Sequence, residues 1–152
     1  MTVIRLCTRK HKELDGVGAG ITGGRWNSKG SAVVYTASCT ALAVLEALVH
    51  MKTLPKNLML LHIEIPPTLP MEVVQQPLIE LSQSQQLGDE WLNANDKPIL
   101  SVPSVVAPLQ RNYILNTAHK LAGAVSIVQV SPFVLDSRLI GHLSEMLVGS
   151  GT

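Results

Sequence analysis

The sequence predicts an α+β domain in which short strands outnumber helices. Three segments rich in apolar and β-branched residues, 2–8, 33–36 and 57–65, are short enough for strands and are bounded by charged residues, glycine or proline. Between the second and the third lies an apolar segment, 41–51, whose length fits a helix. A chain of 152 residues is long enough to bury a core of its own, so we expect one domain spanning residues 1–152.

The composition leaves the substrate open but argues against some partners. The chain carries 12 lysines and arginines against 11 acidic residues, a net charge of +1, so nothing favours direct binding to nucleic acid or to an anionic membrane. No apolar run approaches the roughly 20 residues that cross a bilayer. The two cysteines, Cys7 and Cys39, are far apart and no signal-peptide pattern is present, so we expect a cytoplasmic protein. Self-association to a homo-oligomer is left open.

The first predicted strand carries a cation among apolar residues. Residues 2–8 alternate apolar and polar side chains, which is the period of a half-buried strand. Arg5 lies inside this strand and has two interpretations: its guanidinium reaches solvent at a sheet edge, or it is anchored to an anion inside a pocket. The sequence leaves both open. The charged residues 9–15 that follow predict a surface connection.

A glycine-rich segment comes next, and residues 18–23 match the pattern G-x-G-x-x-G. A dinucleotide fingerprint needs a strand directly before this pattern and a helix directly after it, and the sequence predicts neither. We therefore expect a loop whose backbone can approach a ligand closely. Arg25 and Lys29 add two cations, which suits a phosphate-bearing ligand; the alternative is an irregular surface loop with solvated cations. Trp26 is expected to be a packing anchor.

Glu46 is the only carboxylate between residues 16 and 63 of the sequence, and it lies on the apolar helix predicted for 41–51. An acidic side chain is rarely buried unless it is paired, so Glu46 either lines a cavity or meets a cation. Both interpretations make it a candidate site residue. His50 lies four residues later on the same helix face, but no third ligand has a supporting spacing, so we expect no metal. Tyr35 closes the strand that precedes this helix.

The second half of the chain predicts further strands joined by peripheral connections. Residues 68–86 are polar and interrupted by proline, which predicts a peripheral connection with a short helical piece and little chemistry, and 87–94 predict a short helix. A strand is expected over 99–107 and a last strand over 125–130. A terminal helix is expected over 137–147.

Ser104 is a second candidate because of the proline before it. Pro103 lacks the amide donor of a strand ladder, so the strand expected over 99–107 is interrupted there or lies at an edge. Ser104 is therefore displayed at a break in the sheet. A buried serine bonded to backbone is one interpretation, and a site residue is the other. No G-x-S-x-G elbow is present, so nothing marks Ser104 as a nucleophile.

Six blocks, taken together, resemble a known family. The chain contains GGRWNSKG, VVYTA, LAVLEALVH, GDEWL, VPSVV and NYILN in this order, and it closely resembles the RES domain, named for arginine, glutamate and serine residues that these blocks contain. The resemblance runs from Arg5 to Arg138, and the combination is far more specific than any single block. It indicates a single RES domain over essentially the whole chain.

The resemblance implies a fold similar to that of ADP-ribosyltransferases, with two mostly antiparallel β-sheets flanked by short helices. It implies a toxin of a bacterial toxin–antitoxin pair that depletes NAD⁺ by cleaving its nicotinamide glycosidic bond. The implied partner is an Xre-type antitoxin protein that occludes the active site and supplies any DNA binding. NAD⁺ would be the substrate, without a metal.

The resemblance also implies which residues form the site. Those implied to act in catalysis are Glu46, Arg25, Tyr35 and Ser104. Those implied to bind NAD⁺ are Arg5, Arg25, Tyr35, Ser104 and, as a weaker candidate, Asn112.

These residue types suit the cleavage of the nicotinamide bond. The nicotinamide ring of NAD⁺ is a cationic pyridinium, so it leaves as a neutral base without a proton donor. One carboxylate, Glu46, is then enough to stabilise the positive charge that builds on the ribose. We expect Arg5 and Arg25 to hold the pyrophosphate. Tyr35 would stack on the nicotinamide or ribose, and Ser104 would orient Glu46 or the ribose through a hydrogen bond.

Several alternatives remain open after the resemblance. Hydrolysis is the first expectation, while phosphorolysis and transfer of ADP-ribose to a host protein share the same bond-breaking step. The alternative from a different functional class is that the chain is not an enzyme but a module that only binds its antitoxin. Two departures from the family pattern limit the resemblance: residues 71–87 are shortened, and Thr117 stands where a proline is common. The first departure affects a loop that would face the substrate or the partner.

Overall fold

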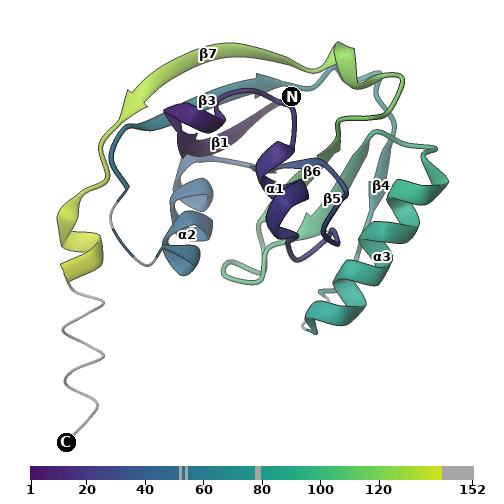
Figure 1. The fold of residues 1–152 in the computed structure, drawn as a ribbon, viewed down its shortest axis with the longest axis horizontal. Coiled ribbons are helices and arrows are strands. Elements are labelled where there is room, and N and C mark those ends of the chain that lie inside the picture. The colour runs from purple at the N-terminus through teal and green to yellow at the C-terminus, as the bar shows by residue number, and fades with distance from the viewer. Residues whose placement is uncertain (52, 54, 78–79, 142–152) are drawn as a thin grey trace, which may run out of the picture.

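The computed structural model describes residues 1–141 apart from 52, 54, 78 and 79. Its centre is a sheet of seven strands in the order β4-β5-β6-β2-β1-β3-β7, flanked by helices (Figure 1). The strands are β1 (Thr2–Thr8), β2 (Val33–Ala37), β3 (Leu58–Glu64), β4 (Met71–Val73), β5 (Ile99–Pro103), β6 (Arg111–Asn116) and β7 (Ser126–Phe133). The helices are α1 (Val17–Thr22), α2 (Thr40–His50) and α3 (Leu81–Ala94), with 3-10 turns η1 (Arg9–His11) and η2 (Ala122–Ala124).

The strands form one folded sheet rather than two separate ones. Five of its six neighbouring strand pairs are antiparallel and β4–β5 is parallel, which confirms the α+β class and the mostly antiparallel pairing. The two expected sheets are corrected to one continuous ladder, because Ile4 pairs with Ala37 and so joins β1 to β2. The junction between β1 and β2 divides the sheet into two halves. One core cluster combines Val3 of β1 and Leu61 of β3 from one half with Leu115 of β6 from the other. The two halves therefore share one core cluster, and their hydrogen bonding is continuous.

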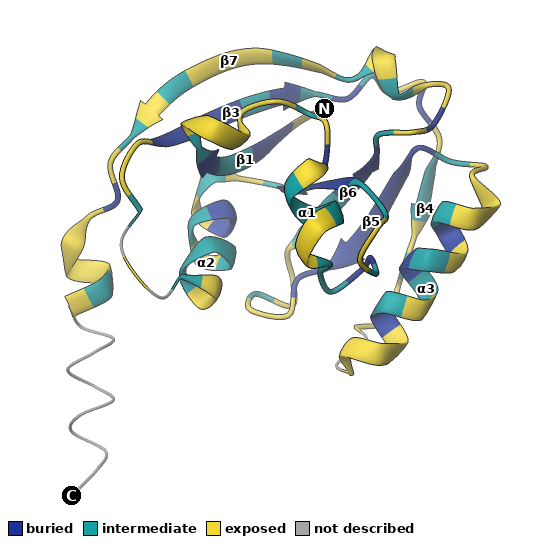
Figure 2. Cartoon of the chain, viewed as in Figure 1, coloured by how far each residue is buried: buried dark blue, intermediate teal, exposed yellow. Residues whose placement is uncertain are grey.

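Helix α2 packs on the other face of the sheet, where β1 meets β2. Leu42 and Ala43 of the helix form a buried cluster with Ile4, Ala37 and Leu60. In Figure 2 the strand β5 is buried throughout and β6 is buried over its second half, whereas β7, at one edge of the sheet, is largely exposed. The packed face of α2 thus lies over the junction between the two halves.

A separate cluster holds α3 and the turn before β2 onto the sheet. Trp91 from α3 and Trp26 from the turn pack together with Val33, Leu100 and Ile114. Trp26 is 3% exposed, so the expectation that it anchors packing is confirmed. This cluster fixes the glycine-rich segment between a helix and the strands.

Residues 17–22 form helix α1, where the glycine pattern predicts a loop. Gly16 precedes the helix with a φ of 68°, and a Cβ at this position would lie 2.7 Å from the Val33 nitrogen, so glycine is required. Asp15 Oδ1 accepts a hydrogen bond from Val17 N at the same end. This bond and the packing of α1 against β2 outweigh the low helix propensity of glycine.

Helix α3 begins at Leu81, six residues before the start predicted at position 87. Its buried residues, Ser84, Gly88 and Trp91, have helical spacing, but the first two are not large apolar residues. The apolar period is therefore weak, and the sequence predicts only a short helical piece in this connection, where the structure has one helix that continues to Ala94. Strands β4 and β6 also lie outside the predicted set, because their place in the sheet depends on pairing with β5.

The other predicted elements agree with the structure within a few residues. Strands β1, β2 and β3 and helix α2 lie where the sequence predicts them, and β5 ends at Pro103 as its missing amide donor requires. Residues 137–141 are helical, and the rest of the helix predicted to 147 lies outside the described residues. Within the described ranges, no helix is both long and apolar enough to cross a membrane.

Candidate active site

Three side chains from distant parts of the chain meet at one carboxylate. Glu46 lies on α2, Ser104 directly follows β5, and Asn112 is near the start of β6. Glu46 Oε1 accepts a hydrogen bond from Ser104 Oγ at 2.7 Å and another from Asn112 Nδ2 at 2.6 Å. Among the described residues, no hydrogen bond reaches the other oxygen, Oε2. One oxygen of the carboxylate is therefore fixed, and the other is free to meet a ligand.

The positions of Glu46 and Asn112 follow from helix and strand periods. Glu46 comes four residues after Leu42 and three after Ala43, so it shares the face of α2 that packs on the sheet. Asn112 pairs in register with Ala37, which belongs to the cluster under that same face. The helix and the strand thus bring the carboxylate and the amide together.

Ser104 is buried and bonded to backbone, as one of its two predicted interpretations has it. Pro103 ends β5, and Ser104 directly after it is 0% exposed. Its Oγ accepts a hydrogen bond from Ala107 N at 3.1 Å while donating to Glu46. The serine is therefore a buried residue bonded to backbone that also contacts the carboxylate.

Tyr35 lies two residues before Ala37 on the same face of β2. Its hydroxyl donates to Asn27 Oδ1 at 2.6 Å and accepts from Trp26 N at 3.0 Å. Burial raises the pKa of Tyr35 to about 12, so the hydroxyl keeps its proton at neutral pH. The neutral phenol is thus a fixed link between β2 and the turn before it.

Arg25 lies in this turn, between Gly24 and Trp26, whose backbone nitrogens both donate hydrogen bonds. Gly24 forms an isolated antiparallel bridge with Asn27, which closes the turn around Arg25 and Trp26. The positive charge of Arg25 lowers the pKa of Tyr35, an effect that burial outweighs. Arg25 and Tyr35 therefore share one neighbourhood.

Arg5 lies where β1 and β2 separate after their single paired position. Because β1 lies between β2 and β3, the sheet-edge interpretation of Arg5 is wrong. Its Nη1 donates to Tyr35 O at 3.4 Å. Arg5 Nε and Asn112 Oδ1 are both buried and have no hydrogen-bond partner in the described part of the chain. Buried polar atoms are nearly always paired, so these two atoms are a donor and an acceptor that a ligand could use.

The six candidates form two groups that β2 connects. Since Ala37 pairs with Asn112, Tyr35 and Asn112 are diagonal neighbours on one sheet face, an arrangement with typical separations of about 7–8 Å. Within the described residues, no hydrogen bond joins Arg5 or Tyr35 to Glu46. The structure thus brings Glu46 together with Ser104 and Asn112, and it links Arg5 to Tyr35 in an adjacent group.

Comparison with known proteins identifies the family. The profile of the RES domain matches residues 2–136. The chain belongs to the RES-domain family. It is 37% identical over 147 residues to the Prs ADP-ribosylating toxin of Sphingobium sp. (strain YBL2), covering 88% of this chain and 90% of that protein. Toxin Res of Pseudomonas putida (strain KT2440) is 35% identical over 139 residues, covering 85% and 94%.

A solved structure shares the fold of this RES-domain chain. A chain of the M. tuberculosis MbcT–MbcA toxin–antitoxin complex superposes with a TM-score of 0.74 and covers 88% of this chain and 84% of its own length. The sequence identity is 16%, so this likeness concerns the fold.

Sequence reasoning missed the residues that hold the turn of the RES domain. Asn27 is 0% exposed, and its Nδ2 donates to Ala19 O at 2.9 Å and to Ser31 O at 3.0 Å. Asp89 accepts a hydrogen bond from Ser28 N at 3.0 Å. Both residues belong to blocks that carry the family resemblance, GGRWNSKG and GDEWL, and this was the signal available in the sequence.

Glu46 and His50 share a helix face, as a pair of metal ligands would, but they do not belong to a metal-binding group among the described residues. His50 is exposed at the end of α2. Within the described ranges, no three His, Cys, Asp or Glu side chains are grouped closely enough to hold a metal ion.

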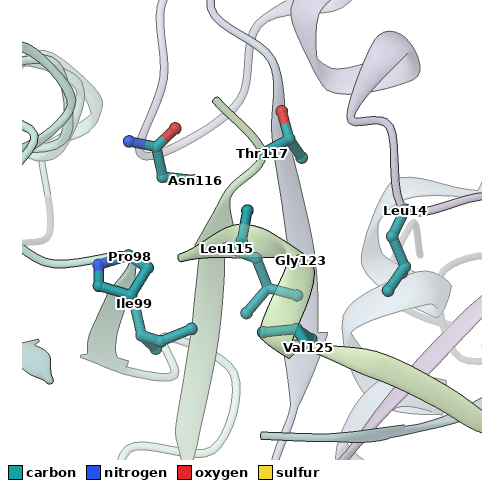
Figure 3. A pocket seen from close by; sticks show the side chains of 9 residues that line it. Leu14, Pro98, Ile99, Leu115, Asn116, Thr117, Gly123 and Val125 are labelled. Carbon is teal, nitrogen blue, oxygen red and sulfur yellow. The ribbon is translucent and has the colours of Figure 1, made fainter. Parts of the chain in front are cut away.

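A pocket of about 300 Å³ lies away from these residues, beside the start of β5 and the end of β6 (Figure 3). Figure 3 shows Leu14, Ile99, Leu115 and Val125 among the side chains that line it, and most of them are apolar. None of the six candidates lines this pocket. The candidate site of the RES domain is therefore defined by its hydrogen bonds and unpaired polar atoms.

Proposed function

We propose that this RES-domain chain is the toxin of a toxin–antitoxin pair and cleaves the nicotinamide glycosidic bond of NAD⁺. The observation that carries the proposal is the Glu46 carboxylate, whose Oε1 is held by Ser104 and Asn112. A charge fixed in this way suits the stabilisation of a transition state. The name of the Sphingobium relative, an ADP-ribosylating toxin, supports NAD⁺ as the substrate, because ADP-ribose is transferred from NAD⁺.

Glu46 would act on the charge that develops during cleavage. The electron pair of the breaking bond moves to the nicotinamide nitrogen, which becomes neutral, while positive charge builds on the ribose. Oε2 of Glu46 would lie near the ribose carbon or accept a hydrogen bond from a ribose hydroxyl. Because Ser104 and Asn112 fix Oε1, the carboxylate does not need to reorganise as the charge appears.

The remaining candidates would bind the substrate around this carboxylate. Arg5 Nε is buried and lacks a partner among the described residues, so it can donate to a phosphate oxygen. Arg25 would hold the pyrophosphate with the planar fork of its guanidinium. The ring of Tyr35 would stack on the nicotinamide or ribose. Asn112 Oδ1, also unpaired, would accept a hydrogen bond from a ribose hydroxyl.

The group that receives the ADP-ribosyl unit distinguishes three reactions. Water gives hydrolysis, phosphate gives phosphorolysis, and a protein side chain gives ADP-ribosylation. Hydrolysis needs no second substrate and is our first candidate. Transfer to a host protein is the second, because the name of the Sphingobium relative favours it.

Product analysis tests the proposal and separates these reactions. Purified protein is incubated with NAD⁺ with and without phosphate, and with labelled NAD⁺ in a bacterial lysate. Nicotinamide release is expected in each case, with ADP-ribose as the product of hydrolysis, ADP-ribose 1-phosphate as that of phosphorolysis, and labelled protein as that of transfer. A protein that releases no nicotinamide under any of these conditions would contradict the proposal and favour a non-catalytic module that binds its antitoxin.

The proposal includes an antitoxin partner in the cytoplasm. An enzyme that consumes NAD⁺ harms its own cell unless it is inhibited, so we propose that an Xre-type antitoxin covers the region of Arg25 and Glu46. The structural neighbour from a toxin–antitoxin complex supports a partner of this kind. Co-expression followed by size-exclusion chromatography is expected to give a stable complex. A chain that is expressed alone in bacteria, stays active and does no harm would contradict the toxin function.

A further inference from the structure

Three residues on one face of α3 contact the turn that precedes β2. Gly88 and Asp89 come three and four residues after Gln85, which places all three on one side of the helix. Gln85 Nε2 donates to Gly24 O at 2.9 Å. Asp89 Oδ1 accepts from Ser28 N at 3.0 Å, and Ser28 Oγ donates to Asp89 Oδ2. The helix is therefore bonded to both ends of the turn.

Gly88 brings the helix backbone into direct contact with the middle of this turn. A Cβ at position 88 would lie 1.8 Å from Trp26 O and 2.6 Å from the carbonyl carbon of that residue. Real Cβ atoms do not approach so closely, so any side chain at this position would push the turn away from α3. Glycine inside a helix costs about 1 kcal/mol relative to alanine, and this contact explains why the helix contains one.

The contacts from α3 fall on both sides of Arg25. Gln85 donates to the carbonyl group of Gly24, the residue before Arg25, and Gly88 packs against the carbonyl group of Trp26, the residue after it. Trp26 N in turn donates to the hydroxyl of Tyr35. A displacement of the turn would therefore move Arg25 and disturb the hydrogen bond that fixes Tyr35.

We propose that Gln85, Gly88 and Asp89 are positioning residues that set Arg25 to hold the pyrophosphate of NAD⁺. The inference rests on the proposed function and goes beyond it by assigning a task to α3. It differs from the expectation that residues 68–86 carry little chemistry, since Gln85 belongs to that segment. A purely structural role for the three residues would lower stability and would affect activity independently of Arg25.

Gly88→Ala is the sharpest test, because alanine raises the helix propensity of α3 while its Cβ displaces the turn. It is expected to lower kcat/KM for NAD⁺ by about 10- to 100-fold, the scale of a misplaced binding group. Gly123→Ala is the matched control, since a Cβ there meets nothing within 4 Å, and it is expected to leave kcat/KM unchanged. Asp89→Asn keeps the side-chain shape and serves as the second variant if Gly88→Ala does not fold.

A double-mutant cycle with Arg25→Ala separates positioning from general destabilisation. If α3 acts mainly through Arg25, Gly88→Ala or Asp89→Asn lowers kcat/KM by at least about threefold less in the Arg25→Ala background than in the wild-type background, and the remaining effect is the one on Tyr35. Fully additive effects in folded variants, checked by thermal unfolding, would overturn the inference. So would an unchanged kcat/KM in both single α3 variants. An inactive wild-type protein would instead overturn the proposed function, and with it the task of Arg25.

Discussion

Ser104 Oγ donates a hydrogen bond to Glu46 Oε1 across 2.7 Å, although the two residues are 58 apart in the sequence. The same serine oxygen accepts a hydrogen bond from Ala107 N, and Ser104 is 0% exposed. Ser104 thus fixes the Glu46 carboxylate, and a backbone hydrogen bond from Ala107 in turn fixes the Ser104 side chain. Variants at these two positions can therefore separate effects on activity from effects on stability.

Glu46→Gln keeps the shape of the side chain but removes its charge. If that charge stabilises a developing ribosyl cation, turnover is expected to fall by about 10²- to 10³-fold, or about 3 to 4 kcal/mol of barrier. Folding is expected to survive, because the ion pairs among the described residues do not include Glu46. On one preparation of the variant, thermal unfolding measures its stability and NAD⁺ turnover measures its activity. A well-folded variant that consumes NAD⁺ at the wild-type rate would remove Glu46 from the mechanism.

Ser104→Ala removes one of the two bonds that fix the carboxylate. Turnover is expected to fall by about 10- to 100-fold through misplacement of Glu46. The free energy of unfolding is expected to fall by about 1–2 kcal/mol, because Ala107 N loses its acceptor. Ser84→Ala is the matched control: Ser84 is also 0% exposed, and its hydroxyl donates to the carbonyl groups of Glu80 and Leu81 where its own helix begins. If both variants reduce turnover equally, Ser104 has no special relation to the carboxylate.

Arg25→Lys keeps the charge but loses the planar fork that fits two phosphate oxygens. The Kd for NAD⁺ is expected to rise by about 10-fold or more, the scale of one lost charge-assisted hydrogen bond. Lys12→Ala, which changes the net charge at an exposed site, is expected to have no measurable effect. Calorimetric titration of NAD⁺ into each variant, in the Glu46→Gln background to prevent turnover, gives the comparison. Equal weakening by both changes would show that Arg25 supplies only general electrostatic attraction.

The pKa of Tyr35 predicts a pH dependence of stability. Burial raises this pKa from 10.0 to about 12, so between these values the unfolded chain releases a proton that the folded protein keeps. The free energy of unfolding therefore falls as pH rises from 10 to about 12, and Tyr35 adds no pH dependence below that range.

Tyr35→Phe tests this assignment, because it removes the titrating group. The variant is also expected to lose about 1–3 kcal/mol at neutral pH, since Trp26 N and Asn27 Oδ1 lose their partner. Urea unfolding at several pH values below and above 10 measures both effects. If stability falls with pH equally in the two proteins, Tyr35 is not the group that titrates.

Much of the fold could be predicted because its signals are local. The alternation in β1 and the apolar runs of β3 and α2 are properties of the segments themselves, and the structure agrees with them. Helix α1 could not be predicted, because a glycine-rich sequence becomes helical there only with Asp15 at its start and β2 beside it. Strand β6 lacks a strong pattern of its own and depends on pairing with β2 and β5.

The sequence by itself determined which chemical groups the protein has to work with: one carboxylate on an apolar helix, two arginines, a tyrosine at the end of a strand and a serine after a proline. These follow from residue identity and short-range order. The tertiary structure decided that Ser104 and Asn112 share one oxygen of Glu46, and that α3 holds the turn around Arg25. Those contacts join residues 58 to 66 positions apart, and the register of β2 with β6 and the packing of the helices on the sheet bring them together. No local pattern encodes such distances.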